Sequence, residues 1–336
     1  MTSTDLSEAL RSFFADIWPT DAPIPEPRPL EQSGWLALVD LGLHQIGVAE
    51  HAGGSGGSLG DLLEVAQLAG RYAADIPIVE HALGAWALTE AGADLPPEST
   101  LTLAHAADAL MAHPDGTVSG SLVRVPWGSM CDHVVSTLPD GRTIALSVSE
   151  AAVEPGLDLA GTPCDTLRFD GASPWHCALG ATAEDLASRA AALRVALIAG
   201  ALQSVSELTQ RYVNERVQFG KPIGSFQAVQ AHIVLVEQMA VLTDSLAHRL
   251  ALGSTLDTFE VQAAELVARE NAVAAVRASH QAHGAIGMTR EYRLQGFTRR
   301  LHVWSAGTTS AVEAAASLGI RSVAAPSVSR LVLDPS

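Results

Sequence analysis

The positive charges of the segment 211–227 are the strongest candidates for ligand binding in this chain. Arg211 and Arg216 close a long helical pattern, and Lys221, the only lysine of the sequence, follows in a short connection. A proline and two glycines in that connection end one helix before the next begins. Guanidinium groups beside a helix N-terminus suit an anion such as a pyrophosphate, because both present N–H donors. The alternative is a plain αα-hairpin with charged residues near its bend.

Two blocks of the sequence resemble the acyl-CoA dehydrogenase family. The first, Arg216-Val-Gln-Phe-Gly-Lys-Pro-Ile-Gly-Ser-Phe-Gln227, is similar to the flavin-binding turn of that family. The second, Gln281-Ala-His-Gly-Ala-Ile-Gly-Met-Thr-Arg-Glu-Tyr292, is similar to its Gln-x-x-Gly-Gly-x-Gly-x-x-x-Glu-Tyr run. The blocks stand in the family's order with a helix-length spacer between them. The resemblance covers nearly the whole chain and is strongest over residues 190–310.

The resemblance implies FAD as the cofactor, with Arg216 paired with its pyrophosphate. Taken alone, the residues leave another interpretation open, in which Arg216 is a solvated surface arginine and the glycines of the second block simply end a helix. The other cofactor-binding residues that the resemblance implies are Gln218, Phe219 and Gln227 at the adenosine half, Gln281, Gly284 and Gly287 at the flavin of a neighbouring subunit, and Thr308.

The resemblance implies no catalytic residue in this chain. Family members remove the α-proton of the acyl thioester with a glutamate while the flavin takes the β-hydride. One position for that glutamate precedes a Gly-Thr, where this chain has Ala306, or Thr308 if the match is made without a gap after Tyr292. The other position lies on the first bundle helix, at Ala190. A thioester α-proton is weakly acidic and needs a positioned base. The nearby Glu207, Glu215 and Glu313 stand at no position that the family uses. We therefore expect a partner subunit to carry the glutamate.

Three stretches of different periodicity must position these residues. Helical spacing of apolar residues predicts an N-terminal helical domain over 1–98, with three or so helices between 35 and 90. Short runs rich in β-formers, separated by Pro-Asp-Gly turns, predict a middle antiparallel β domain over 99–178. Long helical patterns with short connections predict a C-terminal four-helix bundle over 179–336. The predicted fold is α+β, mostly α, as in the acyl-CoA dehydrogenases.

Capping signals set the expected helix ends of the bundle. Thr182, Asp257 and Ser310 each precede an acidic residue by three positions, which is typical of a helix N-terminus. We expect Ser225 to cap the second bundle helix and Gly319 to end the last one.

Composition excludes several classes of partner. The net charge of −17 argues against binding to nucleic acid or to an anionic membrane. The N-terminus lacks the basic start and apolar run of a signal peptide, and no window is long enough for a membrane span. We expect a cytoplasmic protein. A local excess of arginine over 290–300 suggests an anionic ligand or, alternatively, a solvated helix.

Metal binding is not expected. Cys131, Cys164 and Cys177 have no metal-ligand spacing and are interpreted as reduced thiols. His280 and His283 lie three apart on one helical face, but no further ligand accompanies them, so a helix-end histidine pair is the preferred interpretation.

These observations predict a FAD-dependent acyl-CoA dehydrogenase subunit that forms α,β-unsaturated acyl-CoA. The expected partners are an acyl-CoA substrate, an electron-transfer flavoprotein or similar acceptor, and other subunits. The assembly would be a homo-oligomer or a heterotetramer with a paralogous, glutamate-bearing chain, as in dehydrogenases of steroid side chains. The alternatives are a non-catalytic scaffold that completes a partner's flavin site and a non-redox enzyme that reuses the fold.

Overall fold

The structure, a computed structural model, packs as two compact units. The helical unit comprises residues 1–25, 63–74 and 191–336, and the β unit comprises 26–62 and 75–190. The three-domain boundaries expected from the sequence stay a prediction. The structure describes residues 3–20, 24, 30–96, 98–104, 110–253, 255–307, 310–325 and 327.

Helices dominate the fold, as the sequence predicts. They are α1 Ser3–Ile17, α2 Gln32–Asp40, α3 Leu59–Tyr72, α4 Ile78–Glu90, α5 Ala183–Glu215, α6 Gln227–Ala251, α7 Thr258–His283, α8 Leu294–Ala306 and α9 Ala311–Ala324. The strands are β1 Leu101–Leu103, β2 Leu110–Ala112, β3 Val118–Pro126, β4 His133–Thr137, β5 Arg142–Ser147, β6 Ala152–Glu154, β7 Cys164–Ala172, β8 His176–Leu179, β9 Val217–Gln218 and β10 Lys221–Pro222.

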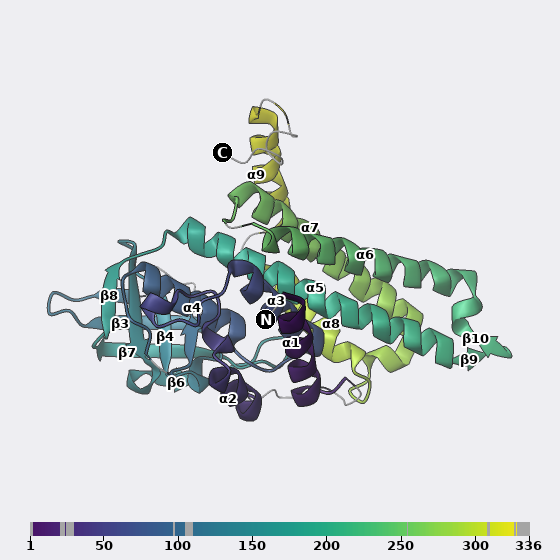
Figure 1. The fold of residues 1–336 in the computed structure, drawn as a ribbon, viewed down its shortest axis with the longest axis horizontal. Coiled ribbons are helices and arrows are strands. Elements are labelled where there is room, and N and C mark those ends of the chain that lie inside the picture. Colours follow the sequence, from purple (N-terminus) through teal and green to yellow (C-terminus); the bar gives the residue numbers. More distant parts are fainter. Residues whose placement is uncertain are drawn as a thin grey trace. The chain divides into compact units, whose positions relative to one another are not determined.

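The helical unit is built on α5, α6, α7 and α8, with the short strands β9 and β10 at one end of α5 and α6 (Figure 1). Helix α3 crosses α5 at two glycines. A Cβ on Gly70 would lie 2.1 Å from the Leu197 carbonyl oxygen, and one on Gly200 would lie 1.8 Å from that of Gln67. The two backbones therefore touch, which any larger residue at either glycine would prevent.

Helix α5 is the core of this bundle. Among the described residues it is the one helix whose length and apolarity would suffice to cross a membrane, yet 78% of its most apolar window is buried inside the protein. A helix that is apolar on most sides and buried is typical of a bundle core.

Three of the four predicted helix caps are confirmed. Asp257 accepts a hydrogen bond from the Glu260 N–H, and Ser310 forms a complete capping box. Thr182 and Asp185 bond reciprocally in the same way at the start of α5. The cap at Ser225 is wrong, because its hydroxyl bonds back to the Pro222 carbonyl and α6 starts one residue after an extended Phe226.

The predicted end of the last helix at Gly319 is also wrong. Gly319 is exposed within α9, which continues to Ala324. A glycine costs a helix roughly 1 kcal/mol but ends it only where the chain turns to a left-handed conformation.

The β unit contains two four-stranded sheets, with strand orders β1-β4-β5-β8 and β2-β3-β7-β6. All pairs are antiparallel except β1 with β4, which is parallel. Side chains from both sheets form one core that includes Leu122, Val134, Ile144 and Leu167. Helix α4 covers the outer face of the first sheet at Gly84, where a Cβ would lie 3.3 Å from Val135.

A pair of histidines is buried between α4 and the loop after α2. The rings of His44 and His81 are 5.3 Å apart and are 5% and 1% exposed. The Leu101 N–H donates to His81 Nδ1, so Nε2 carries the proton of the neutral ring. Burial, and then the neighbouring His44, lower the pKa of His81 to about 3. Both rings are therefore neutral at physiological pH.

Acid should destabilise the β unit through His81. Below pH 6.5, the ordinary histidine value, the unfolded chain binds a proton that the folded chain excludes. The free energy of unfolding should fall by up to about 1.4 kcal/mol per pH unit from pH 6.5 downward, with no effect above it. Urea unfolding at pH values of about 7.5 and 5.5 measures this difference. His81→Gln keeps an acceptor for the Leu101 N–H without titrating, so an equal pH slope in this variant would contradict the prediction.

Candidate cofactor-binding site

The first family-like block forms a small hairpin between α5 and α6. Strands β9 and β10 pair through Gln218 with Lys221, and Phe219 and Gly220 make the turn with φ values of +52° and +80°. The Phe219 ring is 90% exposed. A non-glycine residue in the left-handed region costs on the order of 1 kcal/mol. The one ring contact of Phe219 among the described residues is edge-to-face with Phe226, at 6.0 Å between ring centroids. An exposed, strained aromatic therefore fits a ligand or a neighbouring chain.

Arg216 stands where α5 passes into this hairpin. Its N–H donates to the Tyr212 carbonyl, and its own carbonyl accepts from the Ile223 N–H at 2.8 Å. The backbone is thus fixed on both sides, while the side chain is exposed and forms no ion pair among the described residues. Gln218 and Gln227 are exposed as well, so the polar groups of this block face outward.

The second family-like block follows the end of α7. Gln281 and Gly284 are exposed, and Gly284 has φ +65° and ψ −145°, a conformation that requires glycine. No atom lies within 4 Å of the position of a Gly284 Cβ. Gly287 is different, because a Cβ there would lie 3.0 Å from His283 and from Leu294. Gly284 leaves the backbone open to a ligand, whereas Gly287 serves internal packing.

The two blocks meet at one end of the helical unit. Tyr212 stacks on His283 with 4.6 Å between ring centroids and 17° between planes. Val213, Ile223 and Ala282 pack in one apolar cluster beneath them. The structure therefore packs the two blocks against each other through Ile223 and Ala282, while Thr308 lies outside the described residues.

The histidines of this region are held by hydrogen bonds inside the protein. His280 Nε2 bonds with the Thr298 hydroxyl at 3.0 Å, and His283 Nδ1 donates to the Ser279 carbonyl at 2.8 Å. Burial lowers the pKa of both rings. In the part of the chain that the structure describes, no cluster of three or more metal-ligating side chains is present.

Arg269 of α7 forms hydrogen bonds with the chain around Ala306. Arg269 Nε donates to the Ser305 carbonyl at 2.7 Å, and one Nη donates to the Ala306 carbonyl at 2.9 Å. A Cβ on Gly307, which has φ +60°, would lie 2.5 Å from the Arg269 guanidinium carbon. Glycine is thus required for Arg269 to hold this chain end. Ala306 is exposed and Ala190 is buried, and neither side chain can accept a proton.

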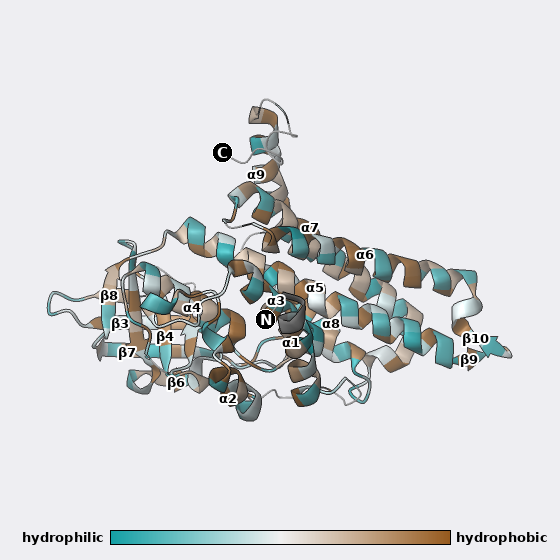
Figure 2. Ribbon diagram, viewed as in Figure 1, coloured by the Kyte–Doolittle hydropathy of each residue, from teal (hydrophilic) through white to brown (hydrophobic). Residues whose placement is uncertain are grey.

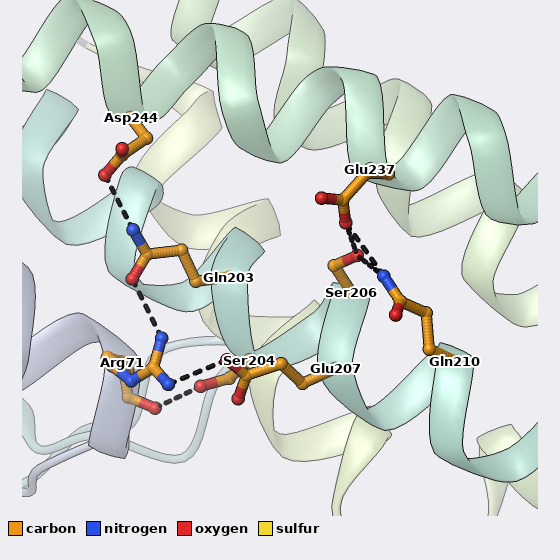
Figure 3. A network of polar contacts seen from close by, with 8 residues as sticks. All are labelled: Arg71, Gln203, Ser204, Ser206, Glu207, Gln210, Glu237 and Asp244. Atoms are coloured by element: carbon orange, nitrogen blue, oxygen red, sulfur yellow. Dashed lines mark hydrogen bonds and ion pairs between the residues drawn. The ribbon is translucent and has the colours of Figure 1, made fainter.

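Most acids inside the helical unit are committed to hydrogen bonds (Figure 3). Asp244 accepts from Gln203 at 2.6 Å, and Arg71 pairs with Glu207 at 2.7 Å. Glu237 accepts from Gln210 and from Ser206. The network joins α3, α5 and α6, so these acids stabilise helix packing.

The other two glutamates named from the sequence lie at the surface of the helical unit. Glu313 is exposed, and its hydrogen bonds with the Ser310 hydroxyl and N–H lower its pKa. Glu215 is exposed at the hairpin end of α5.

Glu265 is an acid that sequence reasoning missed. It lies one helical turn before Arg269 on α7 and forms an ion pair with Arg194 of α5. The two side chains are 17% and 21% exposed. Arg194 itself follows Ala190 by one turn of the same helix. No sequence spacing relates Glu265 to Arg194, because the helices that carry them meet only in the folded bundle.

Two arginines of the segment over 290–300 are buried and bond to backbone carbonyls, so the solvated-helix interpretation is wrong for them. Arg293 is 9% exposed and donates to the carbonyls of Pro19 at 2.8 Å and Tyr72 at 3.0 Å. Arg300 is 4% exposed and donates to the Ala73 carbonyl at 2.8 Å. These carbonyls lie at the C-terminal ends of α1 and α3, where a positive charge is favourable.

Comparison with known proteins agrees with this geometry. The family description "Acyl-CoA dehydrogenase, C-terminal domain" matches residues 183–310. The acyl-CoA dehydrogenase IpdE2 of Mycolicibacterium smegmatis is 30% identical over 278 residues, which span 81% of this chain and 79% of that protein. The chain belongs to the acyl-CoA dehydrogenase family. It is thus an oxidoreductase subunit of the type that acts on the CH–CH bond of acyl-CoA.

Solved structures confirm the acyl-CoA dehydrogenase fold. The steroid acyl-CoA dehydrogenase Tcur3481–Tcur3483, as a G363A variant, has a TM-score of 0.81 at 24% identity and covers 96% of this chain and 98% of its own. The ChsE4–ChsE5 complex of Mycobacterium tuberculosis also has a TM-score of 0.81, at 19% identity, with the same coverage. The predicted fold class, α+β and mostly α with a β domain and a helical bundle, is confirmed.

Proposed function

We propose that this chain is the base-lacking subunit of a FAD-dependent acyl-CoA dehydrogenase that works with a glutamate-bearing partner. Two observations together support this proposal. The two family-like blocks pack against each other at one end of the bundle, and both family positions for the base are alanine.

The exposed residues of the two blocks fit FAD. Arg216 supplies a guanidinium for the pyrophosphate, and Phe219, Gln218 and Gln227 supply an aromatic face and amides for the adenosine half. The open backbone at Gly284, beside Gln281, admits a flat ring system. When bound, FAD takes up the hydride that leaves the acyl chain. The role of this chain is to bind and orient it.

A surface of α6 supports the proposed assembly. Hydrophobic residues run along this helix (Figure 2), and Val234, Val241 and Leu242 are 54%, 54% and 51% exposed. Exposed apolar side chains at helical spacing fit burial against another subunit. Tcur3481–Tcur3483 and ChsE4–ChsE5 are each named as two-component assemblies. We propose that this chain likewise assembles with a second, paralogous subunit. Its substrates would be acyl-CoA esters, including those of steroid side chains, and its electron acceptor a flavoprotein.

Arg216→Ala should weaken FAD binding in the native assembly. Loss of a charge-assisted contact should cost about 1.5–3 kcal/mol of binding free energy. Flavin retention after dialysis and the dissociation constant from flavin fluorescence measure this. Arg277→Ala removes an equally charged, exposed residue from α7 and serves as the matched control. Equal FAD affinity in wild type and Arg216→Ala would count against the proposed site.

Simple observations distinguish the proposed function from the two alternatives, a non-redox enzyme and a scaffold. A colourless native assembly that gains no flavin from added FAD would favour a non-redox enzyme. Activity of this chain without a partner separates an enzyme subunit from a non-catalytic scaffold.

A further inference from the structure

Arg189 is an enclosed arginine near the start of α5, in the β unit. Its guanidinium carbon lies 4.9 Å from the centroid of the Trp86 ring. One Nη donates to the Gly47 carbonyl at 3.3 Å, a long hydrogen bond. Its Nε is buried and has no hydrogen-bond partner among the described residues. The donors of this side chain are therefore mostly unused within the β unit.

The charge of Arg189 is also poorly compensated. Burial lowers the pKa of Arg189 to about 10, and Glu90 offsets this only in part. Glu90 is exposed and forms no ion pair with Arg189 in the described part of the chain. The exposed Arg142 and Arg168 of the same unit, by contrast, are paired with Asp140 at 2.8 Å and Glu154 at 3.0 Å.

An enclosed cation without an anion is costly in a folded protein, because the charge has lost part of its hydration. A planar guanidinium with free donors matches the two oxygens of a carboxylate. Trp86 covers one face of this group, which limits approach to its edge. The Gly47 carbonyl orients the Arg189 guanidinium. Gly47 itself has φ +82°, and Leu62 lies 3.2 Å from the position of its Cβ, so this carbonyl is fixed in place.

We propose that Arg189, backed by Trp86 and oriented by the Gly47 carbonyl, anchors a binding site for a small carboxylate. The carboxylate has two possible sources. One is a free carboxylic acid. The other is a carboxyl group carried at the far end of the acyl chain of an acyl-CoA, and this source rests on the proposed function.

Isothermal titration of the native assembly tests the site with three probes, namely adipate, adipoyl-CoA and hexanoyl-CoA. The two CoA esters have acyl chains of equal length and differ in a terminal carboxylate. We expect adipoyl-CoA to bind roughly 10- to 100-fold more tightly than hexanoyl-CoA. Arg189→Met should abolish this preference, and Arg189→Lys, which keeps the charge without the fork, should retain part of it. Arg168→Met is the control and should leave the preference unchanged.

Each outcome either identifies the source of the carboxylate or contradicts the carboxylate site at Arg189. Arg189-dependent binding of adipate without binding of either CoA ester supports a free acid and contradicts the proposed function alone. Equal affinity for both CoA esters in wild type, or a preference that survives Arg189→Met, overturns the carboxylate site and leaves the proposed function intact. If Arg189→Met forms a smaller assembly than wild type in light scattering and its ligand affinities are unchanged, the anion belongs to a neighbouring subunit. This result would also contradict the carboxylate site. Thermal unfolding of each variant shows that it is folded before titration.

Discussion

The isolated chain should oxidise acyl-CoA substrates about 10²–10⁴-fold more slowly than its assembly with a glutamate-bearing partner, because a positioned general base contributes about that factor. Ala190 and Ala306 offer no proton acceptor. An artificial electron acceptor with a range of acyl-CoA and steroidyl-CoA esters measures the rate. Flavin content is determined in parallel, so that loss of cofactor is not mistaken for loss of a base.

Rapid turnover by the pure homo-oligomer would show that this chain holds a base of its own. Glu215→Gln would then test the one glutamate named from the sequence that has no side-chain partner among the described residues, and Glu265→Gln would test the acid that pairs with Arg194. Glu207→Gln and Glu313→Gln serve as controls, because these acids pair with Arg71 and cap α9.

Arg293→Met should lower the free energy of unfolding of the helical unit by roughly 2–5 kcal/mol. The substitution keeps an apolar stem but leaves the carbonyls of Pro19 and Tyr72 without this donor. Urea unfolding followed by circular dichroism measures the change. Arg277→Met, on the exposed face of α7, is the matched control and should shift stability by less than about 0.5 kcal/mol. Equal stability of the two variants would contradict the bonding described for Arg293.

Features with a local cause were predictable from the sequence. The caps at Thr182, Asp257 and Ser310 depend on side chains that bond three residues ahead, so spacing alone reveals them. Ser225 offered the same chemistry, but the turn that precedes α6 directs its hydroxyl back to Pro222.

Features that depend on tertiary contact were not predictable. Arg293 and Arg300 look like surface charges in sequence, and only the approach of the ends of α1 and α3 gives them buried acceptors. The motif residues Arg216 and Gln281 were found by resemblance. The packing of Tyr212 on His283 and of Ile223 against Ala282, which joins the two blocks, follows no pattern in the sequence.

The visible absorption spectrum of the native assembly, purified with and without added FAD, tests the central claim most directly. We expect flavin absorbance that stays with the protein on gel filtration and that acyl-CoA substrate bleaches only when the glutamate-bearing partner is present. Absence of flavin absorbance after addition of FAD would contradict the assignment of Arg216 and Gln281 to a cofactor site.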